Sequence, residues 1–383
     1  MAARRTRTQS VKRAALVCAA LALLAAVYAT RAARKMPDLE VYWKAGIRAA
    51  AAEPLYRAED GHYQLKYLPA FAVLAVPLGW LPLDAAKAAW FTVSAALLGA
   101  FVALSLAALP ERRRARWVLA AAVVVAMAKF YGHELVLGQV NLLLGAVAMA
   151  AVLALQRGND GVSGALFALA VVVKPYAALF LPWLAAIHRV RALGAAVAGV
   201  IAALLLPVPF YGLSGTWALH ADWWRTVTVS TAPNLLNADN VSLAAFYARW
   251  LGPEGTAAAL AAVTGAALLG VAAHVVRMHG RVREPLGLEA ALLLTLVPLL
   301  SPQGWDYVFL LATPAVAYLV NYADRLPVGW KVAAAVAVGV AAFSLFDIMG
   351  RRAYAAFMSW SIITLCYVVV IGSLWAMRRT RVA

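Results

Sequence analysis

Long apolar stretches separated by short polar segments run along almost the whole chain. The stretches are rich in Ala and Leu, which favour helix, and many approach the roughly 20 residues needed to cross about 30 Å of hydrocarbon. We predict membrane helices near 14–30, 84–109, 115–131, 138–156, 160–173, 175–188, 192–211, 256–276, 286–300, 305–321, 328–347 and 354–376. The pair 160–173 and 175–188 is short enough to form one broken or re-entrant element instead. The pattern therefore predicts an all-α integral membrane protein, with about 12 transmembrane helices in a single domain over 1–383.

Composition points the same way, since 64% of the 383 residues are hydrophobic and only 13% are charged. Soluble domains carry about half apolar and about a quarter charged residues. A soluble fold of this length could not hide so much apolar surface. Lipid in turn requires that backbone polar groups pair internally, which leaves helices or a closed barrel.

The net charge of +17 comes from basic residues clustered between the apolar stretches. This is typical of cytoplasmic loops in a membrane protein and not of a nucleic-acid-binding surface, so we expect no nucleic-acid partner. The clusters are Arg4–Arg13, Arg112–Arg116, Arg189 with Arg191, Arg277–Arg283 and Arg378–Arg381. All fall on the cytoplasmic side if 68–81 does not cross. That segment is short and bounded by prolines, so we interpret it as a juxtamembrane or re-entrant helix.

With this topology, the other polar features gather on the outer side. They include a first outer loop at 31–83, a long loop at 212–255, the Lys174-Pro175 break and the segment 301–307. Loops above a helical bundle are where a site is usually built. No carboxylate lies in the middle of a predicted span, which argues against ion-coupled transport.

The first outer loop contains a candidate general base, Asp38. Pro37 suits the first position of a helix, and a helix N-terminus favours an ionised carboxylate. Helical spacing then places Asp38, Tyr42 and Ala45 on one face, whereas Glu40 points away. The alternative is that Asp38 only caps the helix.

Several short motifs follow one another in a recognisable order. They are Asp38 near Val41-Tyr42, Pro54-Leu55-Tyr56, Lys66-Tyr67-Leu68-Pro69, Gly138-Gln139-Val140-Asn141-Leu142, Lys174-Pro175, Asn240-Val241-Ser242-Leu243 and Ser301-Pro302-Gln303-Gly304-Trp305-Asp306. Together they resemble the GT-C class of membrane glycosyltransferases, and within it family 87. That family includes mycobacterial phosphatidylinositol-mannoside mannosyltransferases and arabinofuranosyltransferases. The resemblance covers about residues 38–310.

The resemblance implies an inverting transfer of a hexose, with mannose favoured, from a polyprenyl-phosphate donor. The acceptor would be a hydroxyl of a glycolipid, a glycan or another molecule at the outer face of a bacterial cytoplasmic membrane. Asp38 would accept the proton of that hydroxyl. We assign no cofactor and no metal site, and whether a divalent metal takes part stays open.

Lipid phosphate is a good leaving group that needs charge stabilisation more than protonation. Candidate phosphate ligands are Lys174, Lys66, Arg351 and Arg352. A snorkelling lysine and arginines attracted to anionic head groups are the alternatives. The resemblance adds Gln139 and Asn141 as donor contacts, with helix capping as the alternative.

Further substrate contacts are assigned to Tyr42, Tyr67, His133, Asn240, Trp305 and Asp306. Many family members carry a His in the stretch around Trp305. Either Asp306 replaces the function of that His, or it only caps a helix. Trp217, Trp223 and Trp224 are interpreted first as interfacial anchors, with sugar stacking or lipid binding as the alternative.

The main rival function is a lipid-linked sugar flippase or a small-molecule transporter. It predicts internal symmetry between the halves and polar groups at mid-membrane depth, and the sequence shows neither. The sequence leaves open which sugar is moved and which acceptor receives it.

Overall fold

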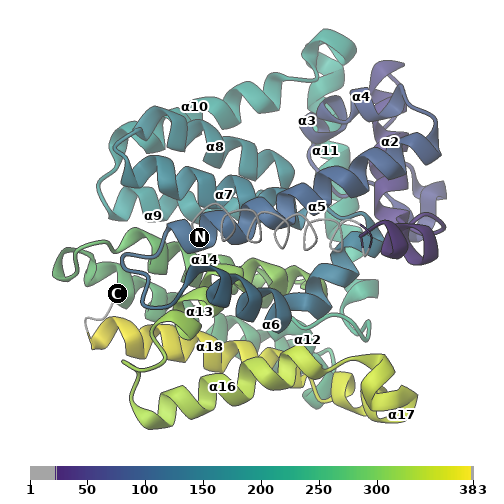
Figure 1. Cartoon of the computed structure of the whole chain (residues 1–383). Coiled ribbons are helices and arrows are strands. Elements are labelled where there is room, and N and C mark those ends of the chain that lie inside the picture. The colour runs from purple at the N-terminus through teal and green to yellow at the C-terminus, as the bar shows by residue number, and fades with distance from the viewer. Residues whose placement is uncertain (1–21, 23, 381–383) are drawn as a thin grey trace, which may run out of the picture.

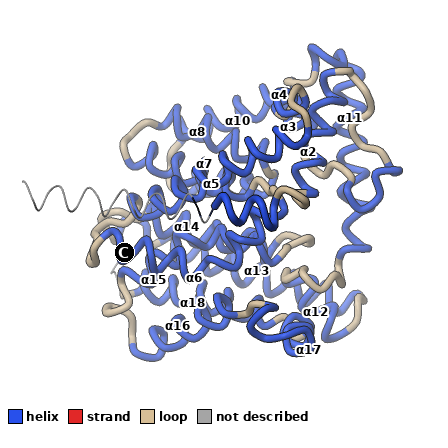
Figure 2. The backbone as a smooth tube through the Cα atoms, turned by 45° about the vertical axis from the view of Figure 1, so that its right-hand side comes forward, coloured by secondary structure: helices blue, strands red, loops and turns tan. Residues whose placement is uncertain are grey.

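The computed structural model describes residue 22 and residues 24–380, and most of the predicted helix at 14–30 lies outside these residues. Within them the regular structure is helical, except for an isolated bridge between Asn240 and Trp305. The predicted all-α class is therefore confirmed. Figures 1 and 2 show helices packed side by side into one bundle, with the short elements α2, α3 and α4 gathered beside α11 at one end.

The first part of the described chain forms a small cap and then enters the bundle. Its elements are η1 (Tyr28–Ala32), α2 (Pro37–Ala50), η2 (Ala58–Tyr63), α3 (Pro69–Leu74), α4 (Val76–Gly79), α5 (Leu83–Ala107), α6 (Arg116–Leu137), α7 (Asn141–Gln156), α8 (Asp160–Val173), η3 (Pro175–Leu179), α9 (Phe180–Ala186) and α10 (Val190–Leu205). The predicted juxtamembrane segment 68–81 is two short helices, α3 and α4, as its prolines indicate.

The second part begins with a long helix and returns to the bundle. Its elements are α11 (Val208–Asn234), α12 (Leu243–Leu251), α13 (Gly255–Arg277), η4 (His279–Arg281), α14 (Leu286–Leu300), η5 (Asp306–Ala312), α15 (Thr313–Asn321), α16 (Val328–Phe343), α17 (Phe346–Ser359) and α18 (Ile362–Arg379). The segment 212–255, predicted as a long outer loop, is mostly helical, because α11 and α12 occupy most of it.

Four of the described helices are long and apolar enough to cross a membrane: α5, α6, α13 and α18. The pairs α10–α11 and α16–α17 bend by 94° and 103°, and counting each pair as one span gives up to six. The protein is thus a multi-pass membrane protein. Twelve crossings are not shown, because helices such as α8, with 14 residues, extend only about 21 Å.

Polar contacts join the helix ends that carry two of the predicted cytoplasmic clusters, those around Arg113 and Arg189. Arg113 pairs with Asp324 at 2.7 Å, and its backbone N–H donates to the Asn321 side chain. At the neighbouring helix ends, Tyr318 donates to the Ala108 carbonyl. Arg189 lies 3.4 Å from Asp160, so α8 and α9 form a hairpin whose turn, at Lys174, faces the other end.

A charge cluster with a buried Glu289–Arg378 pair at its centre ties helices together at this basic end. The Glu289 carboxylate accepts from Trp183 Nε1 at 2.9 Å and lies 3.3 Å from Arg378 Nη2 and 3.0 Å from His279 Nδ1. Both Glu289 and Arg378 have 0% exposure, so neither has water to replace a lost partner. The cluster therefore joins α9, α14 and α18.

Replacing Glu289 with Gln should lower the free energy of unfolding by roughly 3 kcal/mol, because it leaves the Arg378 charge buried without a counter-ion. The measurement is the thermal unfolding midpoint of the purified protein in detergent. Asp347, exposed on α17, provides the control, since Asp347→Asn should leave that midpoint unchanged. An equal effect of both changes would contradict a stabilising role for the cluster.

Candidate functional site

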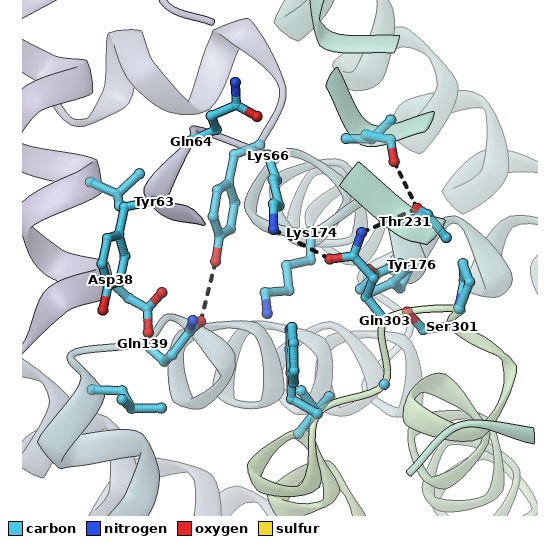
Figure 3. A pocket seen from close by; sticks show the side chains of 18 of the residues that line it. Asp38, Tyr63, Gln64, Lys66, Gln139, Lys174, Tyr176, Thr231, Ser301 and Gln303 are labelled. Carbon is cyan, nitrogen blue, oxygen red and sulfur yellow. Dashed lines mark hydrogen bonds between the residues drawn. The ribbon is translucent and has the colours of Figure 1, made fainter. Parts of the chain in front are cut away.

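A cavity of about 560 Å³ opens at the end of the bundle opposite the basic loops. It lies between α2, the 62–67 segment, the α6–α7 junction, the break after α8, α11 and the 301–308 segment. Figure 3 shows Asp38 and Gln139 on one side, Lys66 and Lys174 reaching toward the middle, and Gln303 with Thr231 across from them. Of the residues assigned from sequence, the cavity is lined by Asp38, Tyr42, Lys66, Tyr67, His133, Gln139, Lys174 and Trp305.

Asp38 is positioned by the packing of the start of α2 against the end of α6. The Met36 N–H donates to the Val136 carbonyl at 3.0 Å. Gly138 ends α6 in the left-handed conformation, with φ of 72°, and a Cβ there would lie 2.9 Å from Leu39 Cβ. Only glycine suits both the conformation and this close approach. No side chain caps the N-terminus of α2, so the structure does not support the alternative that Asp38 only caps this helix.

Three hydroxyl groups fix the orientation of the Gln139 amide. Gln139 Oε1 accepts from Tyr42 at 3.1 Å and from Tyr67 at 3.2 Å, and Nε2 donates to the Tyr307 hydroxyl at 3.2 Å. Tyr42 and Tyr67 also contact each other, with 2.7 Å between their oxygens. Gln139 thus forms a rigid polar wall beside Asp38.

Burial raises the pKa of the Asp38 carboxyl above its usual range, while the Gln139 amide and the ammonium groups of Lys174 and Lys66 lower it in part. Burial also lowers the pKa of Lys66, and the charge of Asp38 opposes this shift. Asp38 and the two lysines are therefore electrostatically coupled across the cavity. A raised pKa makes the carboxylate a stronger base, as proton abstraction requires.

Lys66 is fixed at both its backbone and its side chain. The Lys66 carbonyl accepts from Trp223 Nε1 at 3.2 Å, and Nζ lies 3.5 Å from Gln303 Oε1. Gln303 Nε2 donates in turn to Thr231 at 3.1 Å. Helix α11 thereby positions a cation on the cavity wall.

Lys174 lies at the break between α8 and η3, where Pro175 prevents continuation of the helix. Its backbone is extended, and its side chain is 8% exposed with Nζ 5.8 Å from the centre of the Tyr67 ring. A snorkelling lysine would reach water or head groups. Lys174 instead lines the cavity, and no side chain of the described residues forms a hydrogen bond with its ammonium group.

Asn141 does not line the cavity. Its side-chain Nδ2 donates to Glu134 at 2.7 Å, and the Leu142 N–H donates to the same carboxylate at 3.1 Å. Glu134 therefore caps α7, and Asn141 supports that cap. The helix begins between Gln139 and Asn141, which is why only Gln139 faces the cavity.

Asp306 is likewise absent from the cavity wall, and it does not cap η5 with its side chain. The carboxylate is fully buried, 3.2 Å from His133 Nδ1 and 3.5 Å from Lys129 Nζ. The Asp306 carboxylate thus reaches the cavity through His133. No group of three His, Cys, Asp or Glu residues that could hold a metal ion occurs in the described part of the chain.

Asn240 is buried and joins two segments behind the cavity instead of lining it. Its Nδ2 donates to the Pro302 carbonyl at 2.9 Å, and its Oδ1 accepts from the Ser242 N–H. The Val241 N–H donates to the Gly304 carbonyl at 2.7 Å. These contacts hold the turn that presents Trp305 to the cavity.

Arg351 and Arg352 are exposed on α17 and do not line the cavity, so the expectation that they bind donor phosphate is not supported. Gly350, with φ of 74°, interrupts the helix just before them. Their exposure favours the alternative, attraction to anionic lipid head groups.

Some cavity residues were not assigned from the sequence. The quoted motif around Ser301 contained Gln303 without a role for it, and Tyr307 directly follows that motif. Thr231 lies in the segment predicted as a loop, where the sequence indicates no helical face. Asp239 precedes the Asn240 motif, and only the folded chain shows that it lines the cavity.

The acid limb of a pH–rate profile should reflect the coupling between Asp38 and Lys174. With Asp38 as the predicted base, which must be ionised to accept a proton, kcat/KM should rise with pH through the raised pKa of Asp38. Lys174→Met should move this limb to higher pH, because it removes a charge that lowers the pKa. Lys331→Met, on the exposed face of α16, is the control. If the acid limb of Lys174→Met lies at the same pH as that of the wild type, the coupling between Asp38 and Lys174 is excluded.

The sequence profile of glycosyltransferase family 87 matches residues 65–302. No curated protein and no solved structure matches the chain. The matched region contains Lys66, Gln139 and Lys174 of the cavity wall, and it covers more than half of the chain. The chain therefore belongs to glycosyltransferase family 87 and is a membrane glycosyltransferase.

Proposed function

We propose that this enzyme transfers a hexose, with mannose favoured by the family resemblance, from a polyprenyl-phosphate donor to an acceptor hydroxyl with inversion at the anomeric carbon. The observation that carries the proposal is the meeting of a carboxylate, Asp38, with two cations, Lys66 and Lys174, in a single cavity. An acceptor oxygen needs a base, and a departing lipid phosphate needs positive charge. Family membership supports the glycosyltransferase assignment over the flippase alternative.

In the proposed step, the acceptor oxygen gives its proton to Asp38 and forms a bond to the anomeric carbon. The bond from that carbon to the phosphate oxygen breaks on the opposite side, and its electron pair leaves with the phosphate. Lys66 and Lys174 stabilise the resulting charge. Both lysines line the cavity, where an anionic ligand can reach them.

We propose that the cavity faces the outside of a bacterial cytoplasmic membrane and that several of the shorter helices also cross. The support is the separation of the cavity from the basic clusters around Arg113 and Arg189. Basic clusters favour the cytoplasmic side. A donor with its phosphate at the opposite surface could then enter from the outer leaflet.

The test supplies purified protein in proteoliposomes with radiolabelled polyprenyl-phosphate mannose, glucose and arabinose, together with octyl α-mannoside, octyl β-glucoside and phosphatidylinositol as acceptors. We expect transfer from at least the mannose donor, with an inverted linkage by NMR. Retention of configuration would exclude the single displacement at Asp38. Movement of intact donor across the bilayer without transfer would support the flippase reading.

A further inference from the structure

Two polar arms extend from the centre of the cavity, and they differ in charge. One arm contains Lys66, Gln303 and Thr231, connected by the contacts described above. The other begins at Asp38 and continues through Gln139 and Tyr307 to His133, whose ring centre lies 5.3 Å from that of Tyr307. The two arms therefore offer different chemistry to the two substrates.

The second arm ends in an unassigned carboxylate, Asp239, which lines the cavity near His133. The Asp239 backbone carbonyl accepts from the Asp306 N–H at 2.9 Å, which brings the two acidic residues together. Burial, and then the charge of Asp306, raise the pKa of the Asp239 carboxyl. The Asp239 carboxylate would repel a phosphate placed beside it, although the charges of His133, Lys129 and Arg249 offset part of its own charge.

His133 is oriented by the buried Asp306. Since Nδ1 faces the Asp306 carboxylate at 3.2 Å, Nε2 is the ring nitrogen left for a ligand in the cavity. Lys129, 3.5 Å from the same carboxylate, offsets the charge of Asp306. His133 and Asp239 thus present one ring nitrogen beside one carboxylate, a combination that can both accept hydrogen bonds from neutral hydroxyls and donate to them.

We infer that His133 and Asp239 form the acceptor subsite, where they bind hydroxyls of a neutral, polyhydroxylated acceptor next to the one that Asp38 deprotonates. Asp306 is a positioning residue, because it does not line the cavity itself and its carboxylate acts through His133. The inference rests on the proposed function. It assigns the phosphate of the donor to the arm that contains Lys66, Gln303 and Thr231, called the lysine arm, and the acceptor to the arm that begins at Asp38.

The test measures KM for each substrate separately, with polyprenyl-phosphate mannose as donor and the best of the three acceptors named above. His133→Ala and Asp239→Asn should each raise the acceptor KM about tenfold, the cost of a lost hydrogen bond, and leave the donor KM within about twofold. Asp306→Asn should produce the same split, because it releases His133. Thr231→Val, on the lysine arm, should raise the donor KM instead.

Three results in the His133 and Asp239 variants would overturn the acceptor subsite. They are a rise confined to the donor KM, an equal rise in the donor and acceptor KM, and no change in either KM. Binding of radiolabelled polyprenyl phosphate checks that each variant is folded, and His133→Gln replaces His133→Ala if the latter fails this check. Absence of transfer by the wild type would instead refute the proposed function. The two failures are therefore distinguishable.

Discussion

Asp38→Asn should lower the rate of sugar transfer by about 10²–10⁴-fold, because an amide cannot accept the proton of the acceptor hydroxyl. The change is close to isosteric, and the wall formed by Gln139 and Tyr42 does not depend on it. The measurement is the steady-state rate with radiolabelled polyprenyl-phosphate mannose. Donor affinity should not fall, since the lysines remain in place.

Two controls separate a lost base from a lost fold. Glu40 lies on the other face of α2, where it pairs with Lys87 at 2.6 Å, so Glu40→Gln should retain transfer. The raised pKa of Asp38 means that the protonated form stabilises the fold and that this contribution is lost as pH rises through that pKa. An uncharged Asn should therefore not lower the unfolding midpoint at neutral pH. Transfer by Asp38→Asn at the wild-type rate would exclude the base assignment.

Lys174→Met should lower kcat/KM by about 10²–10³-fold, because it removes a preorganised charge from the departing phosphate. Methionine fills a similar volume, so packing against Tyr67 should persist. The loss should depend on the leaving group. A synthetic donor with a better leaving group, such as a dinitrophenyl glycoside, should lose much less activity in this variant than the polyprenyl-phosphate donor.

Lys331→Met again provides the matched control, since Lys331 is exposed on α16 and absent from this cavity. Its kcat/KM should equal that of the wild type. Equal losses for both donors in Lys174→Met would point to a general structural effect and would contradict a role at the phosphate.

The fold was predictable where one physical signal dominated. Apolar runs predicted α8 and α14 with the bounds that the structure has, because burial and lipid exposure both require apolar side chains there. Helix α11 was missed because its sequence mixes Trp, Thr and His with apolar residues, a composition that also suits a loop. Its place over the cavity depends on contacts such as Trp223 with Lys66, which lie far apart in sequence.

The site was predictable in part. Helical spacing and the resemblance both pointed to Asp38 and Tyr42, and the Lys174-Pro175 break marked a cation at a helix end. The roles of Asn141 and Asn240 could not be separated from those of cavity residues, because an amide that binds backbone and one that binds substrate have the same sequence signature. Asp239 was missed because it is brought to His133 only by tertiary structure.

The most direct test of the central claim is cysteine labelling at position 38, in a chain whose two native cysteines, Cys18 and Cys366, are replaced by Ser. Asp38→Cys should react with a membrane-impermeant maleimide added to the outside of intact cells, and added polyprenyl phosphate should slow the reaction. Labelling only from the cytoplasmic side, or a rate that polyprenyl phosphate does not change, would contradict a base beside the lipid phosphate at the outer face.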